Sequence, residues 1–427
     1  SSHSDVLHRR RPRLGLRTRA AMDRAEAGPR QPGAASAPVD PRLLGERAFL
    51  PRTIDWVPAS GSLSTGSTGE VNGGHDAERD GPVPAYFLYP RDKIRALCES
   101  RMDRPVGRGL QNKGNTCFFN SVMQALTHTR PLQKFLLSGE HAAGCQIGNG
   151  HGGFCALCVF EGHAREALQD NRSPMNPKAL LKRLQELGGR ALRLGRQEDA
   201  HEFLRQFLDA CHRASLRAVQ ERNAEVPLPV QRTTLVHQLF GGYLRSQVAC
   251  LECQYESNTF DPFLDLSLEV KNSPTLEKAL ENFTKADKLV GPNKYRCKRC
   301  QRNVDATKRF TIHSAPPLLT FQLKRFEYNQ GFRGKIAKNV SFNTSIDLAR
   351  FTTSPDVQAK YRLYAVIVHS GHSARSGHYW AFARHSSGTW YHFDDESVRP
   401  VGEQQVLRQQ AYLLFYESVS PLAVLGG

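Results

Sequence analysis

Residues 112–120, NKGNTCFFN, place Cys117 where a turn rich in glycine and asparagine runs into an apolar, helix-like stretch. Asn115 or Thr116 can cap this helix, so we expect Cys117 in its first turn. There the positive end of the helix dipole and the unpaired backbone N–H groups favour thiolate over thiol. Cys117 is therefore a candidate nucleophile, and the alternative is a buried structural cysteine.

A cysteine nucleophile needs a general base and a third group that orients this base. His378 begins one predicted strand and Asp394 ends the next, and two adjacent antiparallel strands can bring them side by side. We favour His378 because Gly377 beside it indicates a close approach of backbone or substrate. Four other histidines remain open as alternatives, namely His369, His372, His385 and His392.

Helical patterns come before strand patterns along the chain. Apolar residues recur with a helical period between 107 and 214, most clearly in 197–214. From about residue 235 the pattern changes to short aromatic or β-branched runs, which predict strands at 241–248, 263–270, 318–326, 362–369, 379–384, 389–393 and 412–416. Helices followed by strands predict an α+β fold with an antiparallel sheet.

Two C-x2-C pairs can each present two thiolates to one tetrahedral ion, and they are formed by Cys250, Cys253, Cys297 and Cys300. Together they predict a closed four-cysteine zinc site, although the interval between the pairs is longer than in compact zinc fingers. Unpaired thiols are the alternative. Four protein ligands leave no position for water or substrate, so this zinc would stabilise the fold and not catalyse.

A third group of candidate ligands lies in a segment rich in glycine and histidine and comprises Cys145, Cys155, Cys158, His141, His151 and His163. It contains another C-x2-C pair, but its other members are irregularly spaced. A second metal and packed or solvent-exposed thiols therefore both remain open.

The 427 residues carry 58 Lys and Arg against 41 Asp and Glu, which gives a formal charge of +17. Residues 1–85 are rich in Arg, Ala, Gly, Pro and Ser, and we expect them to be disordered. The arginines near the start lead into no apolar segment, so we expect no secretory signal. A nuclear or nucleolar address and a solvated basic tail both remain open for this region.

The cysteine content and the hydropathy of the chain indicate the kind of compartment in which we expect the protein. Ten cysteines without an export signal indicate a reducing nuclear or cytosolic compartment. No apolar run approaches the roughly 18 residues that cross a bilayer, so we expect no membrane partner. The chain starts at Ser1, ahead of its first methionine at Met22, so a fragment and an extreme N-terminus foreign to the natural product both remain open.

Several boxes together resemble the ubiquitin-specific proteases: 109–121 around Cys117, 197–203 (QEDAHEF), the two cysteine pairs, 323–326 (LKRF), 376–380 (SGHYW) and 393–395 (FDD). The resemblance covers about residues 106–417. Within this family, the stretches most similar to the ubiquitin carboxyl-terminal hydrolase 36 and 42 subgroup are 234–246 (TLVHQLFGGYLRS), 308–313 (KRFTIH) and 368–371 (VHSG).

The resemblance implies a papain-like right hand in a catalytic domain over 107–417. A helical thumb would occupy about 107–225, antiparallel β fingers with zinc about 240–312, and a mixed palm the remainder. Residues 86–106 would form a lead-in segment and 418–427 a tail. The family uses one structural zinc in the four-cysteine site and no catalytic cofactor.

The resemblance also assigns roles by position in the motifs. Cys117 would be the nucleophile, His378 the general base and Asp394 the group that orients the imidazole. Asn112 matches a side-chain oxyanion donor, a role worth on the order of 3 kcal/mol in related chemistry. Asp395 matches a second acid that assists the histidine or the oxyanion.

Asp199 and Glu202 lie three residues apart on a predicted helix, where a solvated helix face is the usual explanation. The resemblance instead matches them to the acids that bind two arginines in the ubiquitin tail. It implies hydrolysis of the isopeptide or peptide bond after the C-terminal glycine of ubiquitin, with ubiquitin and ubiquitinated proteins as partners.

Two other functional classes remain as alternatives. A ubiquitin-binding protein without catalysis is disfavoured because the reactive residues are all present. A zinc-finger nucleic-acid binder is suggested by the charge and by basic residues around one cysteine pair, namely Lys294, Arg296, Lys298, Arg299 and Arg302. Weak RNA or nucleolar contacts remain open as an auxiliary role. Members of the subgroup are largely nuclear or nucleolar, so we expect that localisation, with the cytoplasm as the alternative.

Overall fold

The computed structural model describes residues 84–99, 102–148, 153–171, 173–190, 192–217, 219, 225–329, 332–354, 359–373 and 376–420. Residues 1–83 of the segment predicted to be disordered, and most of the predicted tail, therefore lie outside the described residues. The described residues all belong to one compact unit. In the part of the chain so described, no helix is both long enough and apolar enough to span a membrane.

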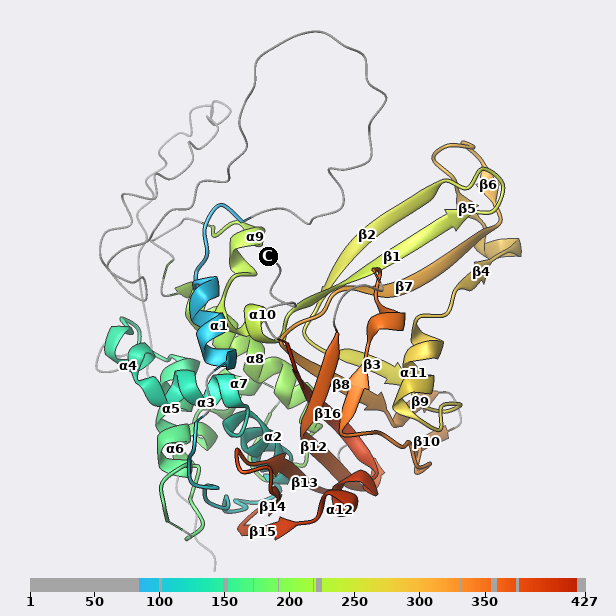
Figure 1. The fold of residues 1–427 in the computed structure, drawn as a ribbon. Helices are drawn as coiled ribbons and strands as arrows, with labels where there is room; N and C mark the ends of the chain where they lie inside the picture. The colour runs from blue at the N-terminus through green and yellow to red at the C-terminus, as the bar shows by residue number, and fades with distance from the viewer. Residues whose placement is uncertain are drawn as a thin grey trace, which may run out of the picture. The chain divides into compact units, whose positions relative to one another are not determined.

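Helices form the thumb and the segments that flank it in sequence (Figure 1). The lead-in contains α1 (Arg91–Glu99), and the thumb contains α2 (Cys117–Thr127), α3 (Arg130–Ser138), α4 (Glu140–Gly144), α5 (Ala156–Ala167), α6 (Lys178–Leu181), α7 (Leu184–Gly188) and α8 (Ala200–Arg217). Between thumb and fingers lie α9 (Leu228–Gln231) and α10 (Leu235–Phe240). Every residue of α2 is buried. This helix packs between α8 and a strand of the palm, so it carries Cys117 to the boundary between thumb and palm.

The helix predicted over 197–214 is present but begins three residues later, as α8. The carboxylate of Asp199 accepts the backbone N–H of His201 at 2.8 Å and so caps the N-terminus of α8. The predicted apolar stripe, which includes Phe203 and Phe207, is buried against the other thumb helices.

The palm is an eight-stranded sheet in the order β15-β14-β13-β12-β16-β8-β3, with β11 paired to β12. Its strands are β3 (Leu266–Glu269), β8 (Leu318–Lys324), β11 (Ser345–Asp347), β12 (Lys360–Ser373), β13 (Ser376–Arg384), β14 (Trp390–Asp394), β15 (Ser397–Val401) and β16 (Ala411–Ser418). Neighbours are antiparallel except β3 and β8, which are parallel, so the sheet is mixed.

The two faces of the palm contribute to different cores. Along β12, Ile367 packs into the core shared with the thumb, whereas its neighbours Val366 and Val368 pack into a second core. This alternation is the period of two expected for a strand that is buried on both faces. The second core is covered by α11 (Leu276–Phe283) and α12 (Glu403–Leu407).

The fingers form a separate four-stranded sheet in the order β2-β1-β7-β4, made of β1 (Gly242–Cys250), β2 (Glu256–Phe263), β4 (Asp287–Leu289) and β7 (Ala306–Ser314). Two small hairpins complete the described strands, β5 (Tyr295–Arg296) with β6 (Asn303–Val304), and β9 (Phe326–Asn329) with β10 (Phe332–Lys335). The strand patterns missed β2 because no face of it is buried, so its sequence shows no alternation of apolar and polar residues.

Candidate active site

Cys117 is the first residue of α2, as predicted, and its side chain is buried. Thr116 precedes it at the cap position but makes no capping hydrogen bond through its side chain. Its hydroxyl instead accepts the backbone N–H of Lys113 at 3.0 Å. The amide groups at the start of α2 are therefore not bound by a capping Thr116 side chain.

His378 lies at the start of β13 and Asp394 at the end of β14, and these two strands are antiparallel neighbours. The imidazole Nε2 is 2.6 Å from Asp394 Oδ1. Hydrogen bonding to the Cys117 thiol, followed by that to Asp394, raises the pKa of His378 to about 9 against the opposing effect of burial. Because Asp394 engages Nε2, Nδ1 is the nitrogen left for the thiol.

The other four histidines have different surroundings. His369 is buried between the rings of Phe326 and Tyr379. The ring of His392 accepts from Arg399 Nε at 3.2 Å, whereas His385 hydrogen-bonds Ser387 and a backbone carbonyl. Among these histidines and His372, the geometry favours His378, since its ring reaches both the thiol and a carboxylate.

Asp395 holds the segment that leads to the cysteine. Its two carboxylate oxygens accept Asn112 Nδ2 at 2.8 Å and Asn120 Nδ2 at 2.7 Å. Its backbone carbonyl accepts the N–H of Leu110 at 2.7 Å. Burial raises the pKa of Asp395, and the two amide hydrogen bonds oppose that shift. Asn112 therefore donates one side-chain amide hydrogen to Asp395, and its second amide hydrogen remains to be donated to a ligand.

Sequence patterns missed two residues of this site, Asn120 and Gln197. The side chain of Gln197 binds both backbone groups of Gly377, donating to its carbonyl and accepting its N–H, each at 2.7 Å. Gly377 has φ +147°, and a Cβ there would lie 2.1 Å from the carbonyl oxygen of Ser370. The close approach predicted at this glycine is thus an approach of backbone, and Gln197 fixes the strand that presents His378.

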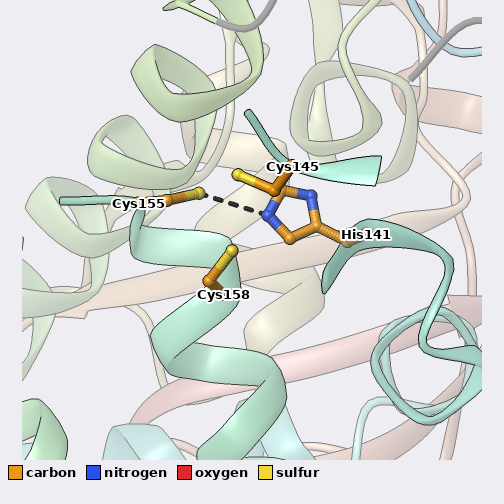
Figure 2. A group of neighbouring side chains, drawn as sticks. All are labelled: His141, Cys145, Cys155 and Cys158. Atoms are coloured by element: carbon orange, nitrogen blue, oxygen red, sulfur yellow. Dashed lines mark hydrogen bonds between the residues drawn. The ribbon is translucent and has the colours of Figure 1, made fainter. Parts of the chain in front are cut away.

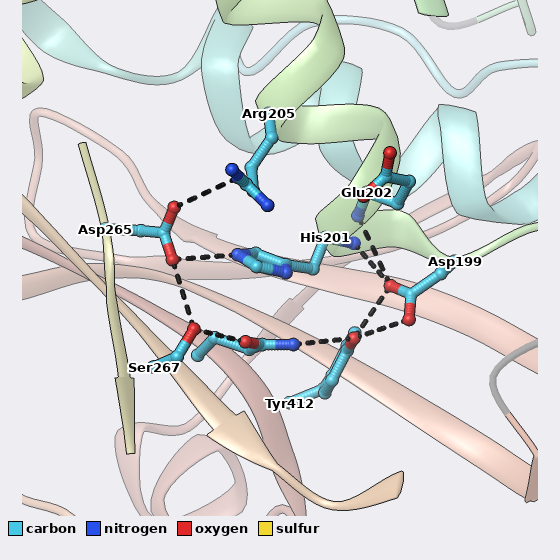
Figure 3. Close-up of polar contacts among 8 residues, drawn as sticks. Asp199, His201, Glu202, Arg205, Asp265, Ser267 and Tyr412 are labelled. Atoms are coloured by element: carbon cyan, nitrogen blue, oxygen red, sulfur yellow. Dashed lines mark hydrogen bonds and ion pairs between the residues drawn. The ribbon is translucent and has the colours of Figure 1, made fainter. Parts of the chain in front are cut away.

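Asp199 and Glu202 lie at the start of α8 but in different environments (Figure 3). Both oxygens of Asp199 accept the hydroxyl of Tyr412, at 2.7 and 2.8 Å. Glu202 is exposed and accepts a hydrogen bond from Gln206. Asp199 therefore anchors the helix to β16 of the palm, and Glu202 is the acid that faces solvent.

A polar network continues from this point across the boundary between thumb and palm. His201 Nε2 lies 2.8 Å from Asp265 Oδ2, and Arg205 approaches the other oxygen at 3.9 Å. Ser267 contacts Asp265 at 3.4 Å and also donates to Gln322 of β8. The first turn of α8 is therefore tied to several palm strands.

The four predicted zinc ligands converge at the tip of the fingers, with all four sulfur atoms within 4.8 Å of one another. The Sγ atoms of Cys253 and Cys297 are 3.6 Å apart, and those of Cys250 and Cys300 are 3.9 Å apart. Zn–S bonds of about 2.3 Å in a tetrahedron give S···S separations of about 3.8 Å, so the donors fit zinc.

Backbone N–H groups also point at these sulfurs in both pairs. Cys253 N–H donates to Cys250 Sγ, and Cys300 N–H donates to Cys297 Sγ, each at 3.4 Å. Such contacts stabilise thiolates, which are the form that binds a metal. The four cysteines form a structural zinc site.

Known proteins share this architecture. The family profile "Ubiquitin carboxyl-terminal hydrolase" matches residues 108–416. Human ubiquitin carboxyl-terminal hydrolase 42 is 42% identical over 334 residues, which are 78% of this chain and 24% of that protein. The probable ubiquitin carboxyl-terminal hydrolase 16 of Schizosaccharomyces pombe is 39% identical over 364 residues, 84% of this chain and 76% of that protein.

Among solved structures, the SAGA Ubp8/Sgf11/Sus1/Sgf73 DUB module bound to ubiquitin aldehyde matches with a TM-score of 0.65 and 30% identity, covering 75% of this chain and 71% of that one. The chain spans about a quarter of the human relative, whose covered share is 24%. The predicted α+β right-hand fold, with helical thumb, mixed palm and zinc-bearing fingers, is confirmed, and the chain belongs to the ubiquitin carboxyl-terminal hydrolase family.

Proposed function

We propose that this chain is a deubiquitinating cysteine peptidase, which hydrolyses the isopeptide or peptide bond after the C-terminal glycine of ubiquitin. The observation that carries the proposal is the convergence of Cys117, His378 and Asp394 at the boundary between thumb and palm. Ubiquitin as the ligand is supported by the related DUB module, which is bound to ubiquitin aldehyde.

In the proposed reaction, His378 takes the proton of the Cys117 thiol, and the sulfur attacks the carbonyl carbon of the terminal glycine. His378 then gives this proton to the nitrogen of the leaving lysine as the C–N bond breaks. A thioester remains on Cys117. Water, deprotonated by His378, then attacks the carbonyl carbon of the thioester. The C–S bond breaks, His378 returns the proton to the sulfur of Cys117, and ubiquitin leaves with a free carboxylate.

The neighbours of the triad support this sequence of proton transfers. Asp394 accepts the Nε2–H of His378, which fixes the tautomer and stabilises the imidazolium. The remaining amide hydrogen of Asn112 and the backbone N–H groups at the start of α2 are the donors for the oxyanion. Asp395 is proposed to position Asn112, because its carboxylate accepts a hydrogen bond from the side-chain amide of Asn112.

Substrate binding is proposed to use the two acids at the start of α8. Glu202 is exposed and can form charge-assisted hydrogen bonds with an arginine of the ubiquitin tail. Asp199 is already bound by Tyr412, so its larger role would be to orient this helix.

The test is release of a fluorophore from the C-terminus of ubiquitin by wild type and Cys117→Ala, with Cys211→Ala as the control. Cys211 is also buried in the thumb but has no place in the triad. Release by wild type and by the control, but not by Cys117→Ala, supports the proposal. Release by Cys117→Ala identifies another nucleophile, and binding without release by wild type indicates the catalytically silent alternative.

Nuclear or nucleolar localisation remains a proposal that rests on the basic segment before residue 84, outside the described residues. For RNA contacts at the fingers, the structure adds that Lys294 lies 3.4 Å from Asp305 and that Arg302 pairs with Glu252. These ion pairs reduce the positive charge available to a phosphate backbone. Imaging the tagged chain, and measuring RNA binding against salt concentration, tests the two proposals separately.

A further inference from the structure

Four soft ligands converge in the thumb, apart from the catalytic site: His141, Cys145, Cys155 and Cys158 (Figure 2). One ligand atom from each lies within 4.8 Å of all the others. Three of the four residues are buried, and Cys158 is half-buried. His163 lies on α5 outside this group, and His151 lies outside the described residues.

The four residues come from two short pieces of chain that meet. His141 is on α4, and Cys145 directly follows the end of that helix. Cys155 holds the cap position of α5, and Cys158 is in its first turn. The N-terminal end of this helix favours negative charge, so both thiols lie where a thiolate is stabilised.

The zinc site of the fingers provides a reference within the same molecule. There, the N–H three residues after a cysteine donates to its sulfur at 3.4 Å in both pairs. In the thumb, the Gly148 N–H donates to Cys145 Sγ at 3.3 Å with the same spacing in sequence. A Cβ on Gly148 would lie 2.8 Å from Cys158 Sγ. The backbone at Gly148 therefore lies closer to this sulfur than a residue with a side chain would allow.

The distances also suit one metal ion. His141 Nε2 lies 3.2 Å from Cys155 Sγ. A tetrahedral zinc with Zn–N near 2.1 Å and Zn–S near 2.3 Å separates nitrogen from sulfur by about 3.6 Å. The set of three sulfurs and one imidazole is a common structural zinc set, and soft thiolates select zinc over harder divalent ions.

We propose that His141, Cys145, Cys155 and Cys158 bind a second structural zinc ion. On binding, the three thiols lose their protons to solvent and the imidazole ligates as the neutral ring. The four protein ligands complete the tetrahedron, so this zinc has no open position for substrate. Its role is to join α4 to α5.

This ion would stabilise the part of the thumb that supports the catalytic helix. Phe160 of α5 packs edge-on against Phe207 of α8, with ring centroids 5.1 Å apart. Phe207 contacts Phe203, which in turn packs against Phe118 next to the catalytic cysteine. Loss of the metal should therefore loosen the thumb without removing any catalytic group.

The first experiment measures zinc in the purified full chain by elemental mass spectrometry, together with zinc K-edge X-ray absorption. The proposal predicts about two zinc ions per chain and a first shell that contains imidazole nitrogen as well as sulfur. About one zinc per chain with a shell of sulfur alone would overturn it, and this measurement does not depend on any variant folding.

Variants assign the two ions. Cys145→Ser with Cys158→Ser should leave one zinc, bound by sulfur alone, and Cys250→Ser with Cys253→Ser should leave one zinc with a mixed shell. Cys98→Ser, which changes a buried thiol outside both clusters, should retain both ions. His141→Cys offers a milder test, because it keeps four ligands and should retain both ions while the nitrogen signal disappears. Loss of no zinc from the Cys145 and Cys158 variant would contradict the proposal.

Discussion

The catalytic site and the tip of the fingers are built in opposite ways. In the catalytic site, a side-chain hydrogen bond joins Asn112 to Asp395, which are 283 residues apart in sequence. His378 and Asp394 keep 41% and 39% of their side-chain surface exposed there. At the described finger tip, the buried apolar cluster contains Cys250, Cys297 and Val304 alone, so the zinc ligands themselves form its core.

This difference separates activity from stability. The catalytic site adjoins the extensive core shared by thumb and palm, so its polar groups can be changed while the fold persists. The fingers have little apolar surface to bury, so their fold depends on the metal. Variants in the catalytic site should affect turnover, and loss of the finger zinc should affect folding.

Removal of the finger zinc has the largest expected effect. Structural zinc in small domains contributes on the order of 10 kcal/mol of apparent binding free energy, so Cys250→Ser with Cys253→Ser should unfold the fingers. Hydrogen exchange followed by mass spectrometry should show fast exchange in β1 and β7. The strands β12 and β13 serve as the internal control and should keep their protection. If β1 and β7 stayed protected in a protein shown to lack this zinc, the fold of the fingers would not depend on the metal.

Removal of the base comes next. His378→Ala should lower kcat/KM by about 10³-fold or more, because the base acts in both halves of the reaction. The unfolding midpoint should stay within a few degrees of wild type, since the ring is half-buried and is not part of the apolar core. His385→Ala is the matched control and should retain activity. If the two histidine variants were equally active, His378 would not be the base.

Removal of the oxyanion donor should be milder. Asn112→Ala should reduce kcat by about 10²-fold with little change in KM, because the amide acts on charge that develops in the transition state. Steady-state kinetics with ubiquitin carrying a C-terminal fluorophore separates the two constants. A raised KM with an unchanged kcat would mean that Asn112 binds ubiquitin in its ground state.

The pH dependence tests the electrostatics of the catalytic site. The pKa of His378 is raised to about 9, so the protonated ring that serves the leaving amine is lost as pH rises through that value. The stability contributed by this proton is fully present below about pH 6.5, the ordinary histidine pKa, and is lost over the same rise. Asp394→Asn removes one cause of the shift, so the alkaline limb of kcat/KM should move to lower pH. An unmoved limb would assign it to a different group.

Loss of the exposed acid is the smallest effect expected. Glu202→Ala should raise KM by up to about fivefold, since one exposed ion pair contributes at most about 1 kcal/mol. The neighbouring acid Glu198 supplies the control, because Glu198→Ala removes the same charge just before the helix. Equal changes in KM would indicate a general effect of net charge instead of a specific contact.

The order of helices and strands could be predicted from the sequence, and so could the residues whose position follows from a local motif. Cys117 at a turn-to-helix junction and the paired cysteines follow from local patterns, which survive in any tertiary context. The role of Gln197 could not be predicted, because it depends on a strand 180 residues away that exposes both backbone groups of Gly377. The hydrogen bond from Tyr412 to Asp199 could not be predicted either, because only the packing of α8 on β16 brings the two residues together.

The most direct test of the proposed triad is covalent capture with ubiquitin that carries a thiol-reactive electrophile at its C-terminus. The wild-type full chain should form one adduct, and peptide mapping by mass spectrometry should place it on Cys117. His378→Ala should form the same adduct much more slowly. An adduct on any of the other cysteines, or equal rates for the two proteins, would contradict the assignment of nucleophile and base.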